Sequence, residues 1–296
     1  MFAAREKVCV ILLALLIYFP VIFFGYTYHD DVRLIIDNQA FLRAGGIPAA
    51  FQHDVFRYPH GPDIYYRPIL TLSLMLDARF SGTRPYLYHG TNLALHILAA
   101  LLLFHWLLRL GYRKESVFLG VLIFTAHPAI AQAVAWIPGR NDTLLAVFAL
   151  ISLLFYQRYG QSGKITDYLG QLLFFFCALF TKESAVLLVA IYLLLDRTKL
   201  RYLVPGWLAA IAGWAILRQL AMVHPAKIQC LAIFNNLPAL LLYLGKVFFP
   251  VNLSVLPLLA DTTLLYGWLA LSIIVVALYF SREKSPGRIV LGLVWY

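Results

Sequence analysis

Long apolar segments, separated by short polar stretches, limit more than any other feature how this chain can fold. A helix needs about 20 mostly apolar residues to cross the hydrocarbon core of a membrane. Only 13% of the 296 residues are charged and 62% are hydrophobic, whereas soluble domains carry about 25% charged residues. We therefore expect an all-α polytopic membrane protein. The expected spans are at about 8–26, 86–108, 117–136, 143–156, 168–180, 184–195, 203–220 and 264–280.

The basic residues indicate the orientation of these spans. The formal net charge is +10, and Lys and Arg cluster between apolar segments, for example at Arg5 and Lys7 and again at Arg113 and Lys114. Such clusters mark cytoplasmic loops under the positive-inside rule, and they favour the phosphates of membrane lipids as partners. We therefore expect a cytoplasmic N-terminus and no nucleic-acid partner.

A long polar segment follows the first span and predicts a large first outer loop, from residue 27 to about residue 85. Within it, residues 68–80 are amphipathic and predict a helix at the membrane interface. Three prolines break the apolar stretch 235–259, which predicts a re-entrant or non-spanning segment. We expect a single transmembrane domain over residues 1–296, and the apolar residues 289–296 predict that it continues beyond the chain.

Three charged motifs fall on one side of the membrane if the spans alternate in direction. They are His29-Asp30-Asp31 after the first span, Arg140-Asn141-Asp142 between the third and fourth, and Lys182-Glu183 between the fifth and sixth. Ionisable residues at membrane depth are costly and usually have a partner or a task. We therefore expect a functional site on the non-cytoplasmic face.

Each motif also has a purely structural interpretation. Asp30 and Asp31 could cap the helix that follows, because Asp is favoured at helix N-termini. Arg140 could pair with Asp142 or extend to the lipid headgroups. Lys182 and Glu183 could neutralise each other at a helix hairpin.

The residue types in these motifs suit the transfer of a sugar from a lipid phosphate. A carboxylate can take the proton of a hydroxyl nucleophile, and we expect Asp30 to be this base, with Asp31 orienting the acceptor. Cations can bind the phosphate and stabilise it as the leaving group, and Arg140 is preferred, before Lys182 and Arg67. The supporting candidates at the same site are His29, His127, Asn141, Asp142 and Glu183.

No metal site is expected, because His89, His96, His105 and His127 lack the i, i+4 spacing of a helical metal site. No cofactor is expected either, since the lipid-linked sugar is itself the donor. A divalent ion at the pair of Asp30 and Asp31 stays an open alternative.

Several motifs follow one another along the chain in an order known from one family. They are HDDVRLIIDN (29–38), YYRPILTLS (65–73), YHGTNLALH (88–96), AHPAIAQAVAWIPGRND (126–142), TKESAV (181–186) and FFPVNLS (248–254). In these motifs the chain resembles the membrane O-mannosyltransferases that carry tetratricopeptide repeats, within the GT-C superfamily of polyprenyl-phosphate-dependent glycosyltransferases. The 126–142 motif and the first acidic pair are the most specific.

The resemblance implies a GT-C-type bundle of transmembrane helices with a large first outer loop. It also implies an inverting transfer without a nucleotide-sugar cofactor, and a catalytic role for Asp30 and Asp31. One departure is Gln132, where the family usually has Glu, so the acceptor side of the site can differ.

We therefore expect a glycosyltransferase that moves a sugar, with mannose as the candidate, from a polyprenyl phosphate to a hydroxyl acceptor such as protein Ser or Thr. A glycolipid acceptor is an alternative, because the sequence does not separate the two. A lipid or solute transporter is another, but it would call for charges along a midplane path and an internal repeat. The sequence shows neither.

Overall fold

The structure is a computed structural model that describes residues 4–28, 30–57, 63–195, 200–222, 235–254 and 263–280. The chain divides into two compact units, and we describe each by itself. Unit 1 comprises residues 1–126 and 133–226, and unit 2 comprises residues 127–132 and 227–296. The expectation of a single domain stays a prediction.

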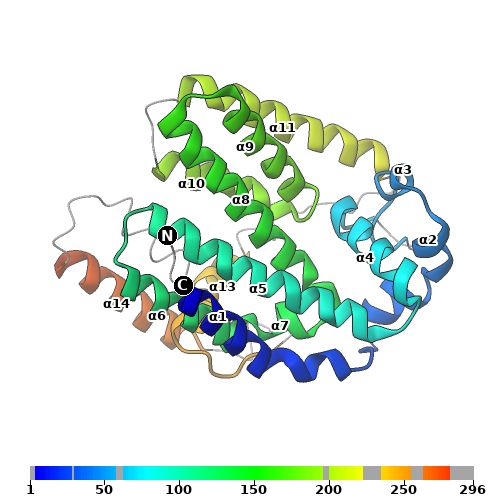
Figure 1. The fold of residues 1–296 in the computed structure, drawn as a ribbon, viewed down its shortest axis with the longest axis horizontal. Helices are drawn as coiled ribbons and strands as arrows, with labels where there is room; N and C mark the ends of the chain where they lie inside the picture. Colours follow the sequence, from blue (N-terminus) through cyan, green and yellow to red (C-terminus); the bar gives the residue numbers. More distant parts are fainter. Residues whose placement is uncertain are drawn as a thin grey trace. The chain divides into compact units, whose positions relative to one another are not determined.

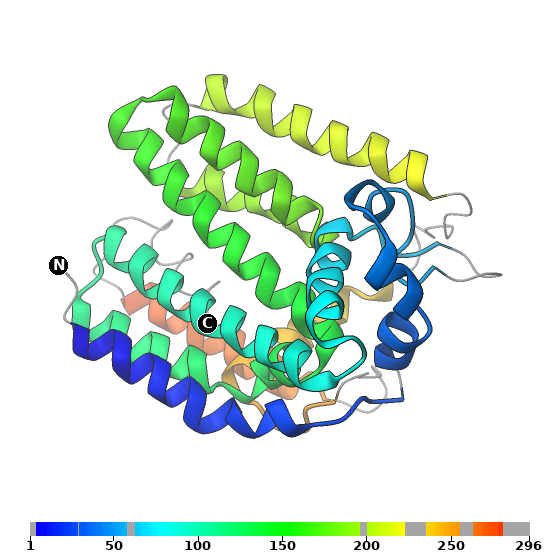
Figure 2. The same ribbon diagram turned by 45° about the vertical axis from the view of Figure 1, so that its right-hand side comes forward.

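The described residues form helices and no β-strand. Figure 1 and Figure 2 show their arrangement. The longer helices are α1 (Ala4–Tyr18), α4 (Pro68–Ser81), α5 (Pro85–Arg109), α6 (Lys114–Ala126), α8 (Arg140–Ser162), α9 (Ile165–Leu179), α11 (Leu200–Ala221), α13 (Leu237–Phe248) and α14 (Leu265–Phe280). The shorter ones are α2 (Gln39–Ala44), α3 (Ile47–Ala50), α7 (Ala131–Ala135) and α10 (Leu188–Leu195).

The helix lengths agree with a multi-pass membrane protein. Among the described residues, four helical stretches are long and apolar enough to cross a membrane, namely Ala4–Phe23, Pro85–Arg109, Ile137–Ser162 and Tyr202–Ala221. Shorter apolar helices are present at Ile165–Leu179, Glu183–Leu195, Leu237–Phe248 and Leu265–Val276. The prediction of an all-α polytopic membrane protein is therefore confirmed. The expected last apolar segment, 289–296, lies outside the described residues.

The expected third span, 117–136, is not one continuous helix. α6 ends at Ala126, and His127 adopts an extended backbone (φ −68°, ψ 125°) before a short 3₁₀ turn begins at Pro128. Proline has no amide hydrogen to donate and disfavours helical geometry in the residue before it. The prediction of an uninterrupted span was therefore wrong at His127, because Pro128 outweighs the apolar composition around it.

In unit 1, α5 packs against α1, α6 and α8, and α8 packs against α9, which in turn contacts α11. The buried residues of α5 recur at helical spacing, as at Asn92, His96, Ala99 and Leu103. Residues three and four apart lie on one face of a helix, so this face is directed into the bundle.

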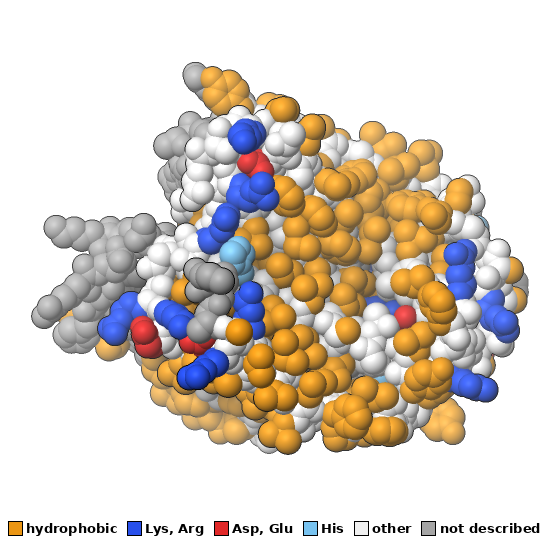
Figure 3. All heavy atoms as spheres, viewed as in Figure 1, with side chains coloured by type: hydrophobic (Ala, Val, Ile, Leu, Met, Phe, Trp, Pro, Cys, Tyr) orange, Lys and Arg blue, Asp and Glu red, His pale blue; other side chains and the backbone are white. Residues whose placement is uncertain are grey.

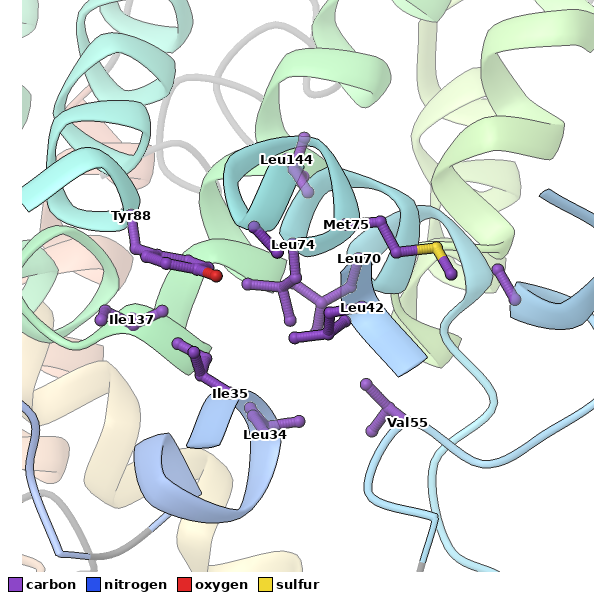
Figure 4. Packing of buried hydrophobic residues seen from close by; sticks show 12 residues of the cluster. Leu34, Ile35, Leu42, Val55, Leu70, Leu74, Met75, Tyr88, Ile137 and Leu144 are labelled. Carbon is purple, nitrogen blue, oxygen red and sulfur yellow. The ribbon is translucent and has the colours of Figure 1, made fainter. Parts of the chain in front are cut away.

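The first loop packs onto the helix bundle through an apolar cluster. Figure 4 shows Leu34 and Ile35 of the loop close to Leu74 of α4 and Tyr88 of α5. The carboxylate of Asp54 fixes the loop backbone, since it accepts hydrogen bonds from the amides of residues 56, 64 and 65 at 2.5 to 2.8 Å. The described parts of the first loop therefore pack against α4, α5 and α8. The predicted helix at 68–80 is confirmed as α4, while its position at a membrane interface stays a prediction.

The surface of unit 1 is rich in exposed apolar side chains, as over α8, α9 and α11 in Figure 3. Leu173 of α9 and Leu208, Ile216 and Leu220 of α11 are exposed. In water such a surface would be an aggregation hazard. Facing lipid, it needs no protein cover, because the backbone polar groups are satisfied within the helices.

In unit 2, α13 and α14 pack closely at two glycines. A Cβ atom on Gly245 would lie 2.7 Å from the amide nitrogen of Gly267, and one on Gly267 would lie 2.2 Å from the carbonyl oxygen of Leu241. Small residues allow membrane helices to approach in this way. The expected helix at 264–280 is confirmed, and the topology of the stretch before it stays a prediction.

Candidate active site

The two adjacent acids of the first loop lie in different environments. Asp31 has no exposed surface, whereas Asp30 is partly exposed. One oxygen of Asp31, Oδ2, accepts a hydrogen bond of 2.8 Å from the amide of Thr27, and Oδ1 is buried without a hydrogen bond. Burial raises the pKa of Asp31, and the Thr27 hydrogen bond and the nearby His89 oppose that shift. His29, the first residue of this motif, lies outside the described residues.

Asp31 does not act as the helix cap that the structural interpretation suggested. A π-helical turn, Val32–Ile36, begins directly after Asp31, and the Asp31 side chain makes no capping hydrogen bond to it. The carboxylate turns back to Thr27 instead. Turns of this type are rare and often occur at functional sites.

Arg140 lies at the start of α8, where it is completely buried in a network of polar groups. Its Nη2 lies 2.6 Å from Asp77 Oδ2 of α4 and donates to the carbonyl of Tyr88 at 2.7 Å. Its Nε donates to Asn92 Oδ1 at 2.7 Å, and its Nη1 to Ser73 Oγ at 3.3 Å. The guanidinium therefore ties α4, α5 and α8 together.

The partner of Arg140 differs from the one considered in the sequence. The structural interpretation paired Arg140 with Asp142, but the ion pair is with Asp77, 63 residues earlier in the chain. Burial raises the pKa of Asp77 and the Arg140 charge opposes that shift, while Thr91 donates to the other carboxylate oxygen at 2.8 Å. With no exposed surface and four partners, Arg140 has no free donor pointing to solvent in this arrangement. Its predicted role as the phosphate ligand stays untested.

The other two cations each form an ion pair with a different part of the chain. Lys182 pairs with Asp142 of α8, and Arg67, just before α4, pairs with Glu183 at 2.9 Å. The side chains of Lys182 and Arg67 are 28% and 12% exposed. The interpretation of Lys182 and Glu183 as a self-neutralising pair was therefore wrong, because the two neighbours in sequence face different partners.

Backbone contacts hold these pairs in place. The amide of Ile69 donates to the carbonyl of Phe180 at 3.2 Å, which fixes the start of α4 beside the Lys182 turn. Thr181 is buried, and its hydroxyl donates to the carbonyl of Cys177 at 2.8 Å. Asn141 is nearly buried, and its Oδ1 has no hydrogen bond.

An ion pair in unit 1 connects two of the three motifs. Arg140 lies two residues before Asp142, which contacts Lys182. The second and third motifs therefore meet, while the placement of all three motifs on one side of the membrane stays a prediction.

His127 belongs to unit 2, and the backbone uses both of its ring nitrogens there. Nδ1 accepts from the amide of Ala129 at 3.2 Å, and Nε2 lies 2.9 Å from the carbonyl of Val247. This arrangement stabilises the break before Pro128. Its supporting role at the site stays a prediction.

Within the described ranges, no three His, Cys, Asp or Glu side chains are grouped to hold a metal ion. The expectations about metals and cofactors stay predictions. Sequence reasoning missed three residues that contact Arg140, namely Ser73, Asp77 and Asn92. A usable signal was present, because these polar residues interrupt the apolar pattern of two helices.

Comparison with known proteins gives matches of one kind. Mouse protein O-mannosyl-transferase TMTC2 is 32% identical over 190 residues, which cover 60% of this chain and 23% of that protein. Mouse protein O-mannosyl-transferase TMTC1 is 29% identical over 189 residues, covering 58% and 20%. The Drosophila melanogaster protein O-mannosyl-transferase Tmtc1 is 29% identical over 177 residues, covering 59% and 20%.

No family model and no solved structure matches the chain. The chain spans less than a quarter of the length of the curated relatives it matches. Within that limit, the resemblance indicated by the motifs is confirmed: this chain is similar to the TMTC protein O-mannosyl-transferases over more than half of its length.

Proposed function

We propose that this chain forms the membrane-embedded part of a glycosyltransferase that moves a sugar, with mannose as the candidate, from a polyprenyl phosphate to a hydroxyl of a protein Ser or Thr. One observation carries the proposal. Two partly exposed cations, Lys182 and Arg67, form ion pairs within a bundle of apolar helices, and the partly exposed carboxylate of Asp30 follows α1 in the chain. The similarity to proteins named O-mannosyl-transferases supports it.

The proposed reaction is a single displacement at the sugar. The acceptor oxygen attacks C1, and its proton passes to the carboxylate of Asp30. The bond between C1 and the phosphate oxygen breaks, and its electron pair leaves with the lipid phosphate. Attack opposite the leaving group inverts the configuration at C1. Asp30 suits the base because it is partly exposed, while the buried Asp31 supports it from behind.

The lipid phosphate leaves as an anion and needs a cation more than an acid. Lys182 and Arg67 are the proposed ligands, because both are partly exposed. Exposed ion pairs are worth only about 0–1 kcal/mol, so a phosphate can replace Asp142, which is 48% exposed, as the partner of Lys182 at small cost. Arg140 then has a positioning role, since it holds α4, α5 and α8 in the geometry that presents the other two cations.

The site is proposed to face the non-cytoplasmic side, because the Lys and Arg clusters assign the opposite side to the cytoplasm. A cysteine placed at the exposed Asp37, in a variant without the native cysteines, should react with an impermeant reagent in intact cells. A cysteine at Arg113, also exposed, is the matched control and should react only after lysis. The reverse pattern would contradict the orientation.

The direct test of function is a transfer assay with the full chain in lipid nanodiscs. Polyprenyl-phosphate-linked radioactive mannose is offered with a Ser/Thr peptide or with membrane glycolipids, and nucleotide-linked mannose is the control donor. Label on the peptide from the lipid donor alone supports the proposal. Label only in the lipid fraction would point to a glycolipid acceptor. Movement of label across a proteoliposome membrane without transfer would point to a transporter.

A further inference from the structure

Exposed aromatic side chains gather at the end of the first apolar helix and just after it. Phe23 and Phe24 are 74% and 50% exposed, and Tyr28 is 99% exposed. Phe19 is 50% exposed and lies edge-on to Phe23, with the ring centroids 5.6 Å apart. Contiguous apolar side chains as exposed as these mark a surface that has a partner. We refer to these four residues as the aromatic group.

The length of the helix indicates where the aromatic group lies relative to a membrane. The helical stretch Ala4–Phe23 has 20 residues, and at 1.5 Å per residue it is about 30 Å long, which matches the hydrocarbon thickness of a bilayer. Arg5 and Lys7 lie at its beginning, and residues 8–28 include no charged side chain. If the basic end lies at one surface of the membrane, the aromatic group reaches the opposite headgroup layer.

Lipid is the partner that suits the aromatic group. Membrane proteins place aromatic rings at the headgroup layer, where one part of the side chain is apolar and another meets water. The backbone is also no longer α-helical there, since residues 19–23 form a 3₁₀ turn and Phe24 is extended (φ −73°, ψ 147°). A protein interface would carry a polar rim around its apolar centre, and residues 8–28 supply no charge for one.

Hydrogen bonds join the segment that carries the aromatic group to the acid pair and to α5. The amide of Thr27, the residue directly before Tyr28, donates to Asp31 Oδ2 at 2.8 Å. The hydroxyl of Tyr26 donates to the carbonyl of residue 83, just before α5, at 2.5 Å. The depth of this segment in the membrane therefore determines the depth of Asp31 and of its neighbour Asp30.

We propose that the aromatic group anchors the outer end of the first span in the lipid headgroup layer and thereby holds Asp30 and Asp31 at the depth of the lipid phosphates. The proposal rests on the proposed function for its consequence in transfer. At this depth a polyprenyl-phosphate donor presents its sugar to the base while its chain stays in the bilayer, and the acceptor arrives from the water. The anchoring itself requires no reaction.

The first test measures depth and does not depend on transfer activity. In a variant without the native cysteines, Tyr28→Cys carries a nitroxide label, and the full chain is placed in nanodiscs. Oxygen reaches labels within the bilayer, and a water-soluble nickel complex reaches labels outside it. The label should lie about 15 Å from the bilayer centre, at the edge of the hydrocarbon core. The controls are labels at Leu12, exposed near the middle of the same helix, and at the exposed Asp37.

The two controls should report the bilayer interior and the water, respectively. A label at position 28 that behaves like either control would overturn the proposal. A label shielded from both reagents would mean that a protein surface covers the aromatic group, and it would overturn the proposal as well. The predicted depth in a protein that transfers no sugar from any donor would support the anchor and contradict the proposed function.

The second test is the rate of transfer from the lipid-linked donor. Misplacing a catalytic group by 1 Å can cost about 10²-fold in rate, so Phe23→Ser with Tyr28→Ser should lower kcat by about tenfold or more. The unfolding temperature should change little, because both side chains are exposed. The matched control, Phe23→Trp with Tyr28→Trp, should keep the wild-type kcat, since Trp suits the same layer. Equal rates in the two double variants would overturn the proposal.

Discussion

Two sets of ion pairs in unit 1 differ in burial and, with it, in what they can do. Arg140 and Asp77 are buried, with side-chain exposures of 0% and 5%, and hydrogen bonds complete the pair. The pairs of Lys182 with Asp142 and of Arg67 with Glu183 are partly open to solvent. Breaking a buried pair costs about 3–5 kcal/mol, whereas an exposed pair contributes about 0–1 kcal/mol. The first is therefore suited to fix helices, and the second to exchange a carboxylate for a ligand.

The largest expected effect is on the buried pair. Arg140→Ala should lower the free energy of unfolding by about 3–5 kcal/mol, because Asp77 is left buried without its cation. The measurement is thermal unfolding of the purified protein, together with its yield. The double variant Arg140→Gln with Asp77→Asn should recover part of the loss, since no charge is then left alone.

The opposite result would be a stable Arg140→Ala protein whose Michaelis constant is raised for the lipid-linked donor and unchanged for the acceptor. It would contradict a purely structural role for the buried pair. Such a result would indicate that Arg140 binds the donor phosphate directly, as expected from the sequence.

A smaller effect is expected at the open pairs. Lys182→Ala should change the unfolding temperature little, because the pair is partly solvated. It should raise the Michaelis constant for the lipid-linked donor by about tenfold, which corresponds to about 1.4 kcal/mol of lost phosphate binding. The acceptor constant should stay near its wild-type value.

The matched control for that prediction is Asp142→Asn, which removes the competing carboxylate and keeps the cation. It should leave the donor constant unchanged or lower it. Equal losses in Lys182→Ala and Asp142→Asn would show that the ion pair is needed as such and that it does not yield to a phosphate.

The smallest effect concerns Asp31 and the stability of the protein against pH. Burial raises the pKa of Asp31, so the folded state holds this proton more tightly than the unfolded state. The stabilisation is complete below the ordinary aspartate value of about 3.9 and is lost as the pH rises through the folded value. Asp31→Asn should therefore unfold at a higher temperature than the wild type at neutral pH, with the difference shrinking toward pH 4.

That comparison is sharpened by Asp37→Asn, an exposed acid of the same loop, which should show no such trend. If the wild type instead became more stable than Asp31→Asn as the pH rises, the predicted direction of the pH dependence would be wrong.

The apolar segments allowed the helices to be predicted, because about 20 apolar residues leave few alternatives to a spanning helix. The contact between the second and third motifs agrees with the expected direction of successive spans, and the position of the first motif stays a prediction. The break at His127 was signalled by Pro128, but the apolar composition around it favoured a straight helix. Periodicity alone does not decide between a straight helix and a helix broken before Pro128.

The partners of the charged residues could not be predicted. Asp77 pairs with Arg140 because of the way α4 lies against α5 and α8, and no spacing rule connects positions 63 residues apart. Lys182 and Glu183 are neighbours in sequence, but consecutive side chains point in different directions and so meet different elements.

The central claim is that Asp30, the partly exposed acid of the pair in the first loop, is the base of a sugar transfer. Its most direct test is the rate of mannose transfer from polyprenyl phosphate to a Ser/Thr peptide by Asp30→Asn in nanodiscs, compared with the wild type and with Asp37→Asn. A general base contributes about 10²–10⁴-fold, so Asp30→Asn should lose at least about 10²-fold in rate with an unchanged unfolding temperature, while Asp37→Asn stays active. Near-normal transfer by Asp30→Asn would contradict the account.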